Sequence, residues 1–459
     1  MNKVITATKQ ICGILCLAII LLPASPAICQ TTINRDKRIS DATGIVSSSS
    51  LKRTVEELVS FHTRHNMSTQ SKEDKGIGAA AAYLEKRLSD LAMGNEDHFS
   101  VQRIQYKAGG QGSRIPRVIT LPNIVATIKG SLNPEAIIVL LAHFDSRTQD
   151  NSDFTAFAPG ANDNGSGVAA LIEIASILSN HPLPVTVKLM FLSGEEHGLL
   201  GAAHMASVAK EENWNILAVL NNDMVSNSHS SDTDNRNNNM LRVFSETIPL
   251  IEDELMARER SFNSSENDSQ SRQLARYIKE VGERYTDNLL IKLIYRNDRF
   301  GRGGDHTPFS RNGFNAVRIC EYYENYDRTH KVTETIDGKE YGDVLEGVDP
   351  EYLRKNTIVN LSVIMNIAYA PAPPAEVYTD VSGLSNKTRV YWKNATGCTE
   401  PYGYYLLVRE TDSPVWQKKI FVKGNEIEVP YSKDNYFFAV QSVNETGNES
   451  LYVFSKGKR

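Results

Sequence analysis

Along the middle of the chain, apolar runs of strand length alternate with segments whose apolar residues recur at helical spacing. The runs are nearly continuous in apolar residues, which is typical of strands in a sheet that is buried on both faces. Because helical segments separate them, the pattern predicts an α/β domain with a mostly parallel central sheet flanked by helices. The runs lie at residues 123–128, 136–142, 185–192, 216–220 and 316–320.

The predicted α/β domain spans residues 51–370. It opens with helical spacing of apolar residues from 51 to 91 and closes with a helix over 351–368. Residues 226–273 are rich in Asn and Ser, so we interpret them as long loops inserted into the domain. The Ser/Thr-rich residues 30–50 are expected to form a loose lead-in.

A second domain is predicted after the α/β domain. Residues 371–375 read Pro-Ala-Pro-Pro-Ala and indicate a linker. Residues 376–459 then contain short runs of alternating apolar and polar residues separated by turn signals, which predict a small all-β sandwich. With the Pro-rich entry, Trp392 on an early strand and the run Tyr-Phe-Phe-Ala-Val at 436–440, this segment resembles a fibronectin type III module.

The first 29 residues have the layout of a secretory signal peptide. Two lysines precede an apolar run at 11–22, and small residues follow, with cleavage expected after Ala27 or Cys29. The alternative is a membrane anchor, but the run is shorter than the ~20 apolar residues that cross a bilayer. A lipid anchor on Cys29 is disfavoured because Ile28 is bulky. We therefore expect a secreted or periplasmic protein with no stable membrane span after cleavage.

Composition narrows the possible functions. The 459-residue chain has 50 basic and 55 acidic side chains and a net charge of −5, so it lacks the basic surplus of nucleic-acid-binding domains. Its 5 cysteines are too few and too scattered for a disulfide scaffold. With 41% hydrophobic residues it has enough core-forming material to exclude a wholly disordered chain.

Side chains that commonly ligate metals lie where the predicted strands end. In an open parallel sheet, the loops at the carboxyl ends of the strands converge on one crevice, so these side chains can meet there. Two imidazoles and three carboxylates suit a pair of Zn²⁺ ions, with one carboxylate shared between the ions. Taken singly each motif is weak, because a His-x-Asp pair is more often a hydrogen-bonded surface pair and adjacent glutamates are usually solvated. The two imidazoles are His143 and His306, the three carboxylates are Asp163, Glu196 and Asp223, and Asp145 and Glu195 lie beside them in the same motifs.

The motifs that carry these residues, taken together, resemble the M28 family of zinc aminopeptidases. They are HFD, GANDNGSG, GEEHGLLGA, NND and GGDHTPF, in this order along the chain. The resemblance implies two zinc ions, with His143 and Asp223 on one, Glu196 and His306 on the other, and Asp163 bridging them.

The resemblance also implies roles for residues beside these ligands. Asp145 would orient His143 from outside the ligand set, and Glu195 would be the general base. Two departures stand out. The family often has an apolar residue where this chain has Asn222, and its late His-Thr-x-x-Asp-Thr segment is His330-Lys-Val-Thr-Glu-Thr here. We take His330 as a candidate for polarising the substrate carbonyl.

The hypothesis with most support is an exported di-zinc aminopeptidase that acts on peptides with a free N-terminus. A glutaminyl cyclase with a single zinc, or a glutamate carboxypeptidase, is the alternative within the same fold. An alternative of another class is a catalytically inert peptide- or surface-binding protein, in which the C-terminal module docks to a surface or glycan. The inert alternative is disfavoured because all five expected ligands and the expected base are present.

Overall fold

The structure is a computed structural model that describes residues 33–397 and 400–459. The predicted signal peptide and the possible lipid-anchor residue Cys29 lie outside the described residues. Within those residues, none of the helices combines the length and the apolar character needed to cross a membrane.

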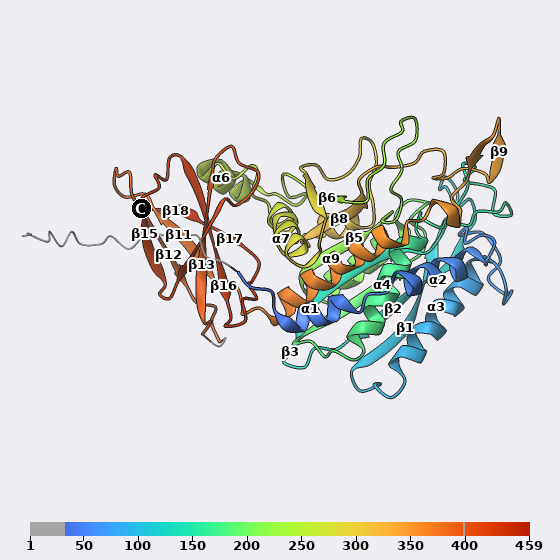
Figure 1. Cartoon of the computed structure of the whole chain (residues 1–459), viewed down its shortest axis with the longest axis horizontal. Helices are drawn as coiled ribbons and strands as arrows, with labels where there is room; N and C mark the ends of the chain where they lie inside the picture. The colour runs from blue at the N-terminus through green and yellow to red at the C-terminus, as the bar shows by residue number, and fades with distance from the viewer. Residues whose placement is uncertain (1–32, 398–399) are drawn as a thin grey trace, which may run out of the picture.

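An eight-stranded sheet forms the centre of the larger part of the molecule (Figure 1). Its strands are β1 (Phe99–Ala108), β2 (Ile119–Ile128), β3 (Asn133–His143), β4 (Val185–Leu192), β5 (Asn215–Asn222), β6 (Met240–Phe244), β7 (Leu290–Ile294) and β8 (Ala316–Glu321). They lie in the order β1-β2-β4-β3-β5-β8-β6-β7. The four central strands β4, β3, β5 and β8 are parallel, whereas β1, β2 and β6 join the sheet antiparallel to their inner neighbours. This confirms the predicted α/β fold with a mostly parallel sheet.

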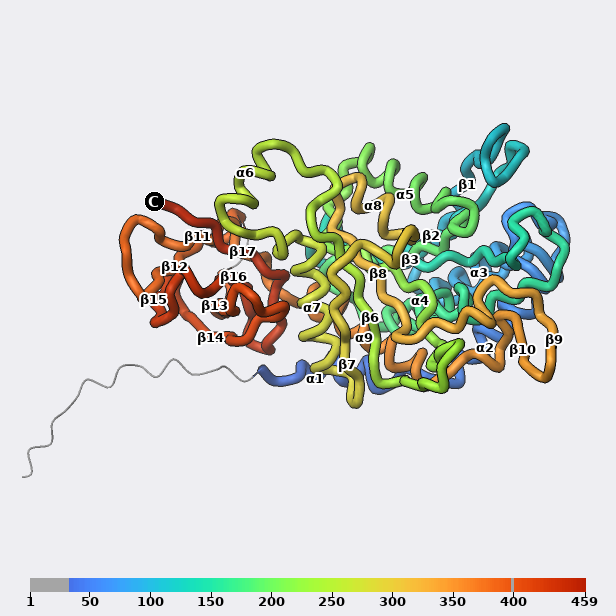
Figure 2. The backbone as a smooth tube through the Cα atoms, turned by 90° about the horizontal axis from the view of Figure 1, so that it is seen from above, coloured from blue at the N-terminus to red at the C-terminus, as the bar shows by residue number. Residues whose placement is uncertain are grey.

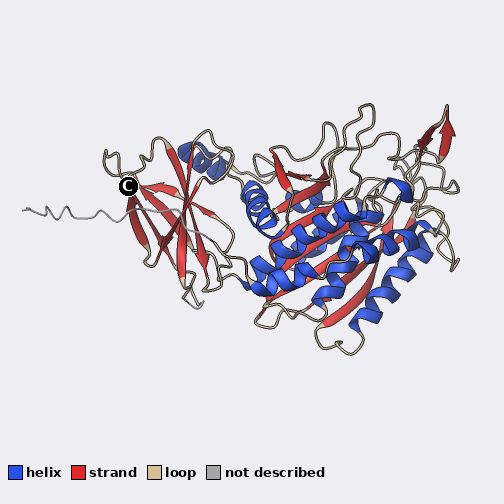
Figure 3. Ribbon diagram, viewed as in Figure 1, coloured by secondary structure: helices blue, strands red, loops and turns tan. Residues whose placement is uncertain are grey.

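Helices cover both faces of the sheet (Figure 3). They are α1 (Lys37–Gly44), α2 (Ser48–Val59), α3 (Gly76–Ala92), α4 (Gly165–Leu178), α5 (Leu200–Glu211), α7 (Gln270–Tyr285), α8 (His306–Arg311) and α9 (Pro350–Tyr369). One more helix, α6 (Glu254–Asn263), has no buried residue and lies beside the β-sandwich (Figure 1). Successive residues of β3 belong to different cores. Ile138 and Leu140 pack with the layer that contains α2, α4 and α9, and Val139 and Leu141 pack with α5 and α8. Burial on both faces is why the strands read as nearly continuous apolar runs.

The structure corrects two expectations about loops. Residues 30–50, expected to be loose, contain α1 and the start of α2. In α1, Ile39 and Ala42 are fully buried, and Asp36 caps the helix by accepting a hydrogen bond from the backbone N–H of Arg38. The polar residues 226–273 contain β6, α6 and the start of α7 rather than loops alone. At α1 and β6, tertiary packing of a few apolar residues outweighs a polar local composition. The helix α6 buries no residue and is capped locally by Asp253, which accepts a hydrogen bond from the backbone N–H of Met256.

The C-terminal residues form an all-β unit of two four-stranded sheets, ordered β15-β12-β11-β18 and β14-β13-β16-β17. The strands are β11 (Glu376–Asp380), β12 (Thr388–Lys393), β13 (Gly403–Glu410), β14 (Lys418–Val422), β15 (Glu426–Val429), β16 (Tyr436–Val443), β17 (Val453–Phe454) and β18 (Lys456–Lys458). The all-β character is as predicted, and the fibronectin type III resemblance stays a prediction.

The β-sandwich packs against the α/β part of the molecule. Leu407, Ala439 and Tyr452 belong to the same continuous core as the α/β sheet, and α7 lies between the two parts (Figure 1). At the opposite end of the molecule, the short hairpin of β9 (Glu334–Ile336) and β10 (Lys339–Tyr341) projects from the α/β part, as two views at right angles show (Figures 1 and 2).

Candidate metal centre

Four buried or half-buried carboxylates and two imidazoles meet at the carboxyl edge of the central strands. His143 is the last residue of β3, Glu195 and Glu196 follow the end of β4, and Asp223 follows the end of β5. The other two come from loops. Asp163 lies just before α4, and His330 lies between β8 and β9. The parallel strands end at one edge, so residues 187 positions apart in the chain become neighbours.

The side chains form two groups that share one carboxylate between them. The Nε2 of His143 lies 3.2 Å from Asp163 Oδ1 and 3.7 Å from Asp223 Oδ1. The Nε2 of His330 lies 3.0 Å from Asp163 Oδ2 and 2.9 Å from Glu196 Oε1. Asp163 therefore presents one oxygen to each imidazole, which is the arrangement of a carboxylate that bridges two metal ions.

The donor atoms fit a pair of metal ions. The ligand atoms of His143, Glu195 and Asp223 lie within 4.8 Å of one another, and so do those of Asp163, Glu196 and His330. The Nε2 of His143 is buried and makes no hydrogen bond to any described residue. Imidazole and carboxylate donors of this kind suit Zn²⁺.

The unbalanced negative charge perturbs the imidazoles. Burial lowers the pKa of His330, but the nearby charge of Glu196 and the hydrogen bonds to Asp163 and Glu196 raise it to about 10. Burial likewise acts against protonation of His143, yet the charge of Glu195 and the close contacts with Asp145 and Asp163 hold its pKa well above the usual value. The cluster thus favours positive charge at both positions, as a cation site would.

Asp145 contacts His143 and the turn that carries Glu195 and Glu196, but it is not a member of either donor group. Its Oδ1 lies 3.5 Å from His143 Nδ1, and its backbone oxygen lies 3.1 Å from the same nitrogen. Its two carboxylate oxygens also accept the backbone N–H groups of Glu195 and Glu196, at 3.3 and 3.2 Å, and Asn66 donates to it at 2.6 Å. Burial raises the pKa of Asp145, but these contacts with His143 and Asn66 hold it below the usual value. An ionised Asp145 therefore fixes the ring of His143 and the turn that carries both glutamates.

Glu195 has a high proton affinity. Burial raises its pKa well above the usual value, His143 acts in the opposite direction, and the charges of Glu196 and Asp223 raise it further. The neighbouring Glu196 differs, because Arg147 donates to its Oε2 at 2.8 Å. Two adjacent glutamates therefore have different environments, and Glu195 is the one suited to accepting a proton.

Comparison with known proteins shows the family of this chain. The sequence model of peptidase family M28 matches residues 123–348. A probable zinc metalloprotease of Leptosphaeria maculans is 37% identical over 410 residues, which is 89% of this chain and 94% of the relative. Another, from Pyrenophora tritici-repentis, is 34% identical over 412 residues, 89% of this chain and 85% of the relative. The chain belongs to peptidase family M28.

Solved structures share the fold of this family member. The aminopeptidase LapA of Legionella pneumophila has a TM-score of 0.51 at 17% identity, over 73% of this chain and 76% of that one. LapB of the same organism has a TM-score of 0.51 at 16% identity, over 74% of this chain and 76% of that one. At this level of identity the likeness concerns the fold alone.

The structure does not place His306 in either group of this M28 member. His306 is the first residue of α8, and its Nε2 lies 2.9 Å from the backbone oxygen of Asn297. His330 occupies the position that the sequence assigned to His306. The signal was present in the sequence, since His330 opens the segment similar to the family's His-Thr-x-x-Asp-Thr, but we assigned it to the substrate carbonyl.

Sequence reasoning also missed residues that hold the ligands in place. Arg318, fully buried on β8, lies 3.2 Å from Asp223 Oδ2 and 3.0 Å from Asp298 Oδ2. Asp343 accepts the backbone N–H of Asp163 at 2.7 Å. Neither lies in a recognisable motif, because each reaches its partner only through tertiary contacts.

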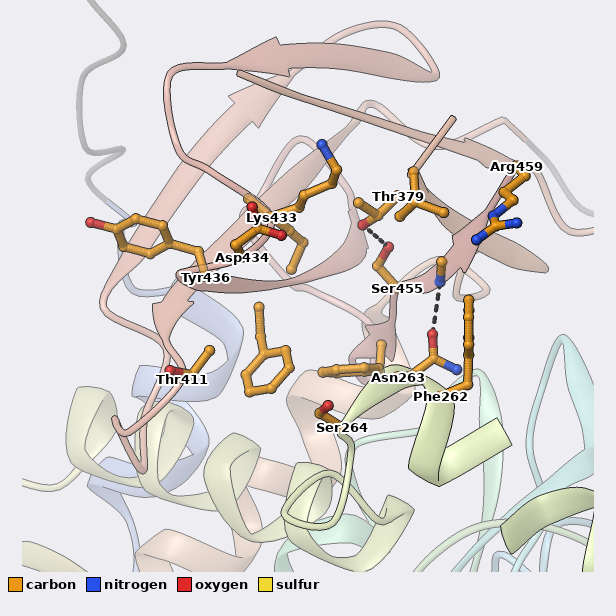
Figure 4. Close-up of a pocket in the computed structure, with 15 residues that line it drawn as sticks. Phe262, Asn263, Ser264, Thr379, Thr411, Lys433, Asp434, Tyr436, Ser455 and Arg459 are labelled. Carbon is orange, nitrogen blue, oxygen red and sulfur yellow. Dashed lines mark hydrogen bonds between the residues drawn. The ribbon is translucent and has the colours of Figure 1, made fainter. Parts of the chain in front are cut away.

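Away from the two donor groups, a cavity of about 520 Å³ lies between α6 and the β-sandwich (Figure 4). Asn263 and Ser264 face it from the α6 side, and Thr379 and Ser455, which hydrogen-bond to each other at 2.6 Å, face it from the sandwich. Among its described lining residues the only carboxylate is Asp434, and none is His or Cys. This cavity therefore lacks a group of metal-type donors, and catalysis is expected at the two donor groups around Asp163.

Proposed function

We propose that this M28 family member is an exported di-zinc aminopeptidase. The observation that carries the proposal is Asp163, whose two oxygens face two separate groups of metal-type donors. His143 and Asp223 would hold one ion, and Glu196 and His330 the other, with Asp163 shared. Two donor groups favour two ions over the single ion of a glutaminyl cyclase, and a complete donor set disfavours an inert binding protein.

Bound at this site, zinc ions would polarise the scissile carbonyl and make an attacking water acidic enough to ionise near neutral pH. The protein's own part is the proton transfer. Glu195 would accept a proton from the attacking water and then donate it to the leaving amine, so that each turnover restores the carboxylate. Asp145 would keep Glu195 at this position through its hydrogen bond to the backbone N–H of Glu195.

Relatives named as probable zinc metalloproteases support the choice of zinc. The aminopeptidase activity is our inference, because the fold is shared with a structure described as an aminopeptidase. Export rests on the signal peptide predicted at residues 1–29 and stays a prediction.

The test uses aminoacyl p-nitroanilides and their N-acetylated forms with the full mature chain. We expect cleavage only of the forms with a free α-amine, about two zinc ions per chain by elemental analysis, and loss of activity with a chelator that Zn²⁺ restores. Cleavage of acetylated substrates at equal rates would reject an aminopeptidase. Full activity in protein shown to contain no metal would reject the metallopeptidase altogether.

A further inference from the structure

The crevice over the donor groups is lined by arginines as well as by the acidic residues of the site. It has a volume of about 370 Å³. Arg114 comes from the connection between β1 and β2, Arg147 follows β3, and Arg299 and Arg302 come from the loop after β7. These four residues approach one cavity from three separate segments of the chain.

The crevice offers little to an apolar side chain. Apart from charged residues, its described lining residues are Leu199 and three glycines. A pocket that selects a large apolar residue is normally built from several apolar or aromatic side chains. Selection here must therefore come from charge or hydrogen bonding.

Two of the four arginines are already committed to carboxylates. Arg299 lies 3.2 Å from Asp298 and 2.6 Å from Glu324. Arg147 donates to Glu196 at 2.8 Å. The protein itself therefore neutralises Arg299, whereas Arg147 shares its partner Glu196 with the second donor group.

Arg114 and Arg302 are not neutralised. The side chain of Arg114 makes one long contact, 3.5 Å to the backbone oxygen of Glu196, and forms no ion pair with a described residue. Arg302 is exposed, and within residues 33–397 and 400–459 no carboxylate pairs with its side chain. Both are exposed and line the crevice, so a bound substrate could contact them.

The sign of the net charge in the crevice follows from its lining residues and the bound metal ions. The acidic side chains that line it are Asp163, Glu195, Glu196 and Asp223. Two divalent cations would offset these four negative charges, including that of Glu196, so Arg147, Arg114 and Arg302 would then leave an excess of positive charge. A guanidinium recognises a carboxylate through paired hydrogen bonds, so an acidic group is the complementary ligand.

We propose that the crevice selects peptides that carry a carboxylate close to the scissile bond, and that Arg302 and Arg114 bind that carboxylate. The proposal rests on the peptidase function above and names its substrate class. The carboxylate has two sources, the side chain of an N-terminal Asp or Glu, or the C-terminus of a dipeptide.

The first experiment compares Glu- and Gln-p-nitroanilide, which differ in charge and hardly in shape. We expect kcat/KM to be about tenfold higher for the Glu substrate, mainly through KM, because a charged hydrogen bond is lost with Gln. The preference should shrink at high ionic strength, since exposed charges are screened. A second pair, Ala-Ala and its amide, tests the C-terminal source in the same way.

The variants are Arg302→Gln and Arg114→Gln. Each should raise KM for the acidic substrate by about tenfold and leave KM for Gln-p-nitroanilide unchanged. Arg117→Gln is the matched control, because Arg117 lies on the same β1–β2 connection and is exposed but does not line the crevice. It should leave both KM values unchanged.

A binding measurement separates this inference from the peptidase proposal. Calorimetric titration of the zinc-loaded protein with free glutamate and glutamine should show tighter binding of glutamate, and Arg302→Gln should remove the difference. If no aminoacyl substrate is cleaved but glutamate binds selectively, the peptidase proposal fails and the arginine site stands. If Leu-p-nitroanilide is preferred and neither arginine variant changes KM or glutamate binding, the arginine site is rejected while the peptidase stands.

Discussion

Two regions of the molecule bury charged side chains, and they balance that charge differently. At the junction of α7 with the β-sandwich, the fully buried carboxylate of Glu449 contacts Arg284 and lies 3.4 Å from Lys419. At the crevice, Asp163, Glu195, Glu196 and Asp223 crowd together with two imidazoles. Each region places acids where water is scarce. At the crevice, Arg147 and Arg318 pair with Glu196 and Asp223, but among the described residues no basic side chain forms an ion pair with Glu195.

The pKa values reflect this difference. Burial alone raises the pKa of Glu449, but Lys419 and Arg284 lower it to about 2. At the crevice, burial together with the neighbouring acids holds the pKa of Glu195 well above its usual value. A balanced buried network stabilises the junction, whereas an unbalanced one needs an external cation and marks the functional site.

The largest effect expected from a single substitution is that of Glu195→Gln on turnover. The amide cannot accept a proton, so kcat should fall by ~10²–10⁴-fold while the zinc content stays the same. Steady-state kinetics and elemental analysis of the same preparation measure both quantities. Loss of zinc from the variant would mean that Glu195 is a ligand, as its place in the first donor group allows.

Replacing His330 and His306 one at a time tests which of them is a metal ligand. His330→Ala should reduce the zinc content from about two ions to about one per chain and remove most of the activity, because it removes one of the imidazole donors. His306→Ala, the control, should keep about two ions. The reverse result would restore the assignment made from the sequence and overturn the one made from geometry.

Substitutions at the junction should change the free energy of unfolding and leave kcat unchanged. Arg284→Met leaves Glu449 with less compensation and should lower the free energy of unfolding by about 3–5 kcal/mol, with kcat of the folded protein unchanged. Arg389→Met is the matched control, since Arg389 pairs with Glu426 on the exposed face of the sandwich. It should change stability by at most about 1 kcal/mol in urea titrations. Equal effects of the two variants would show that the buried pair is not stabilising.

The smallest expected effect is the response of the junction to acid. The folded-state pKa of Glu449 is lowered to about 2 from an ordinary value of 4.5, so its contribution to stability is complete above the ordinary value. It should be lost as the pH falls from there toward the folded-state pKa. Thermal unfolding between these pH values should therefore show a smaller decrease for Glu449→Gln, which has no such proton to bind, than for the unchanged chain.

The sequence predicted the central strands well because they are buried on both faces. β3 and β4 read as unbroken apolar runs, and no local signal competes with them. The sequence prediction failed at α1, where polar composition concealed a helix that packs against the rest of the fold, and at α6, which buries no residue. At the site, the residues at the strand ends and Asp163 lie together as expected, whereas the structure places His330, and not His306, beside Asp163 and Glu196.

The sequence by itself determined the α/β class and the donors at the ends of β3, β4 and β5, since the strand pattern also indicates where each strand ends. Only the tertiary structure decided which histidine completes the second donor group. His306 begins α8 and His330 lies in the loop between β8 and β9, and the choice depends on how the chain returns from β8 to the crevice. The buried ion pairs at the junction were equally hidden, because their partners lie as far apart as Arg284 and Glu449. Local patterns fix elements and their ends, whereas contacts between distant loops depend on packing that no short segment encodes.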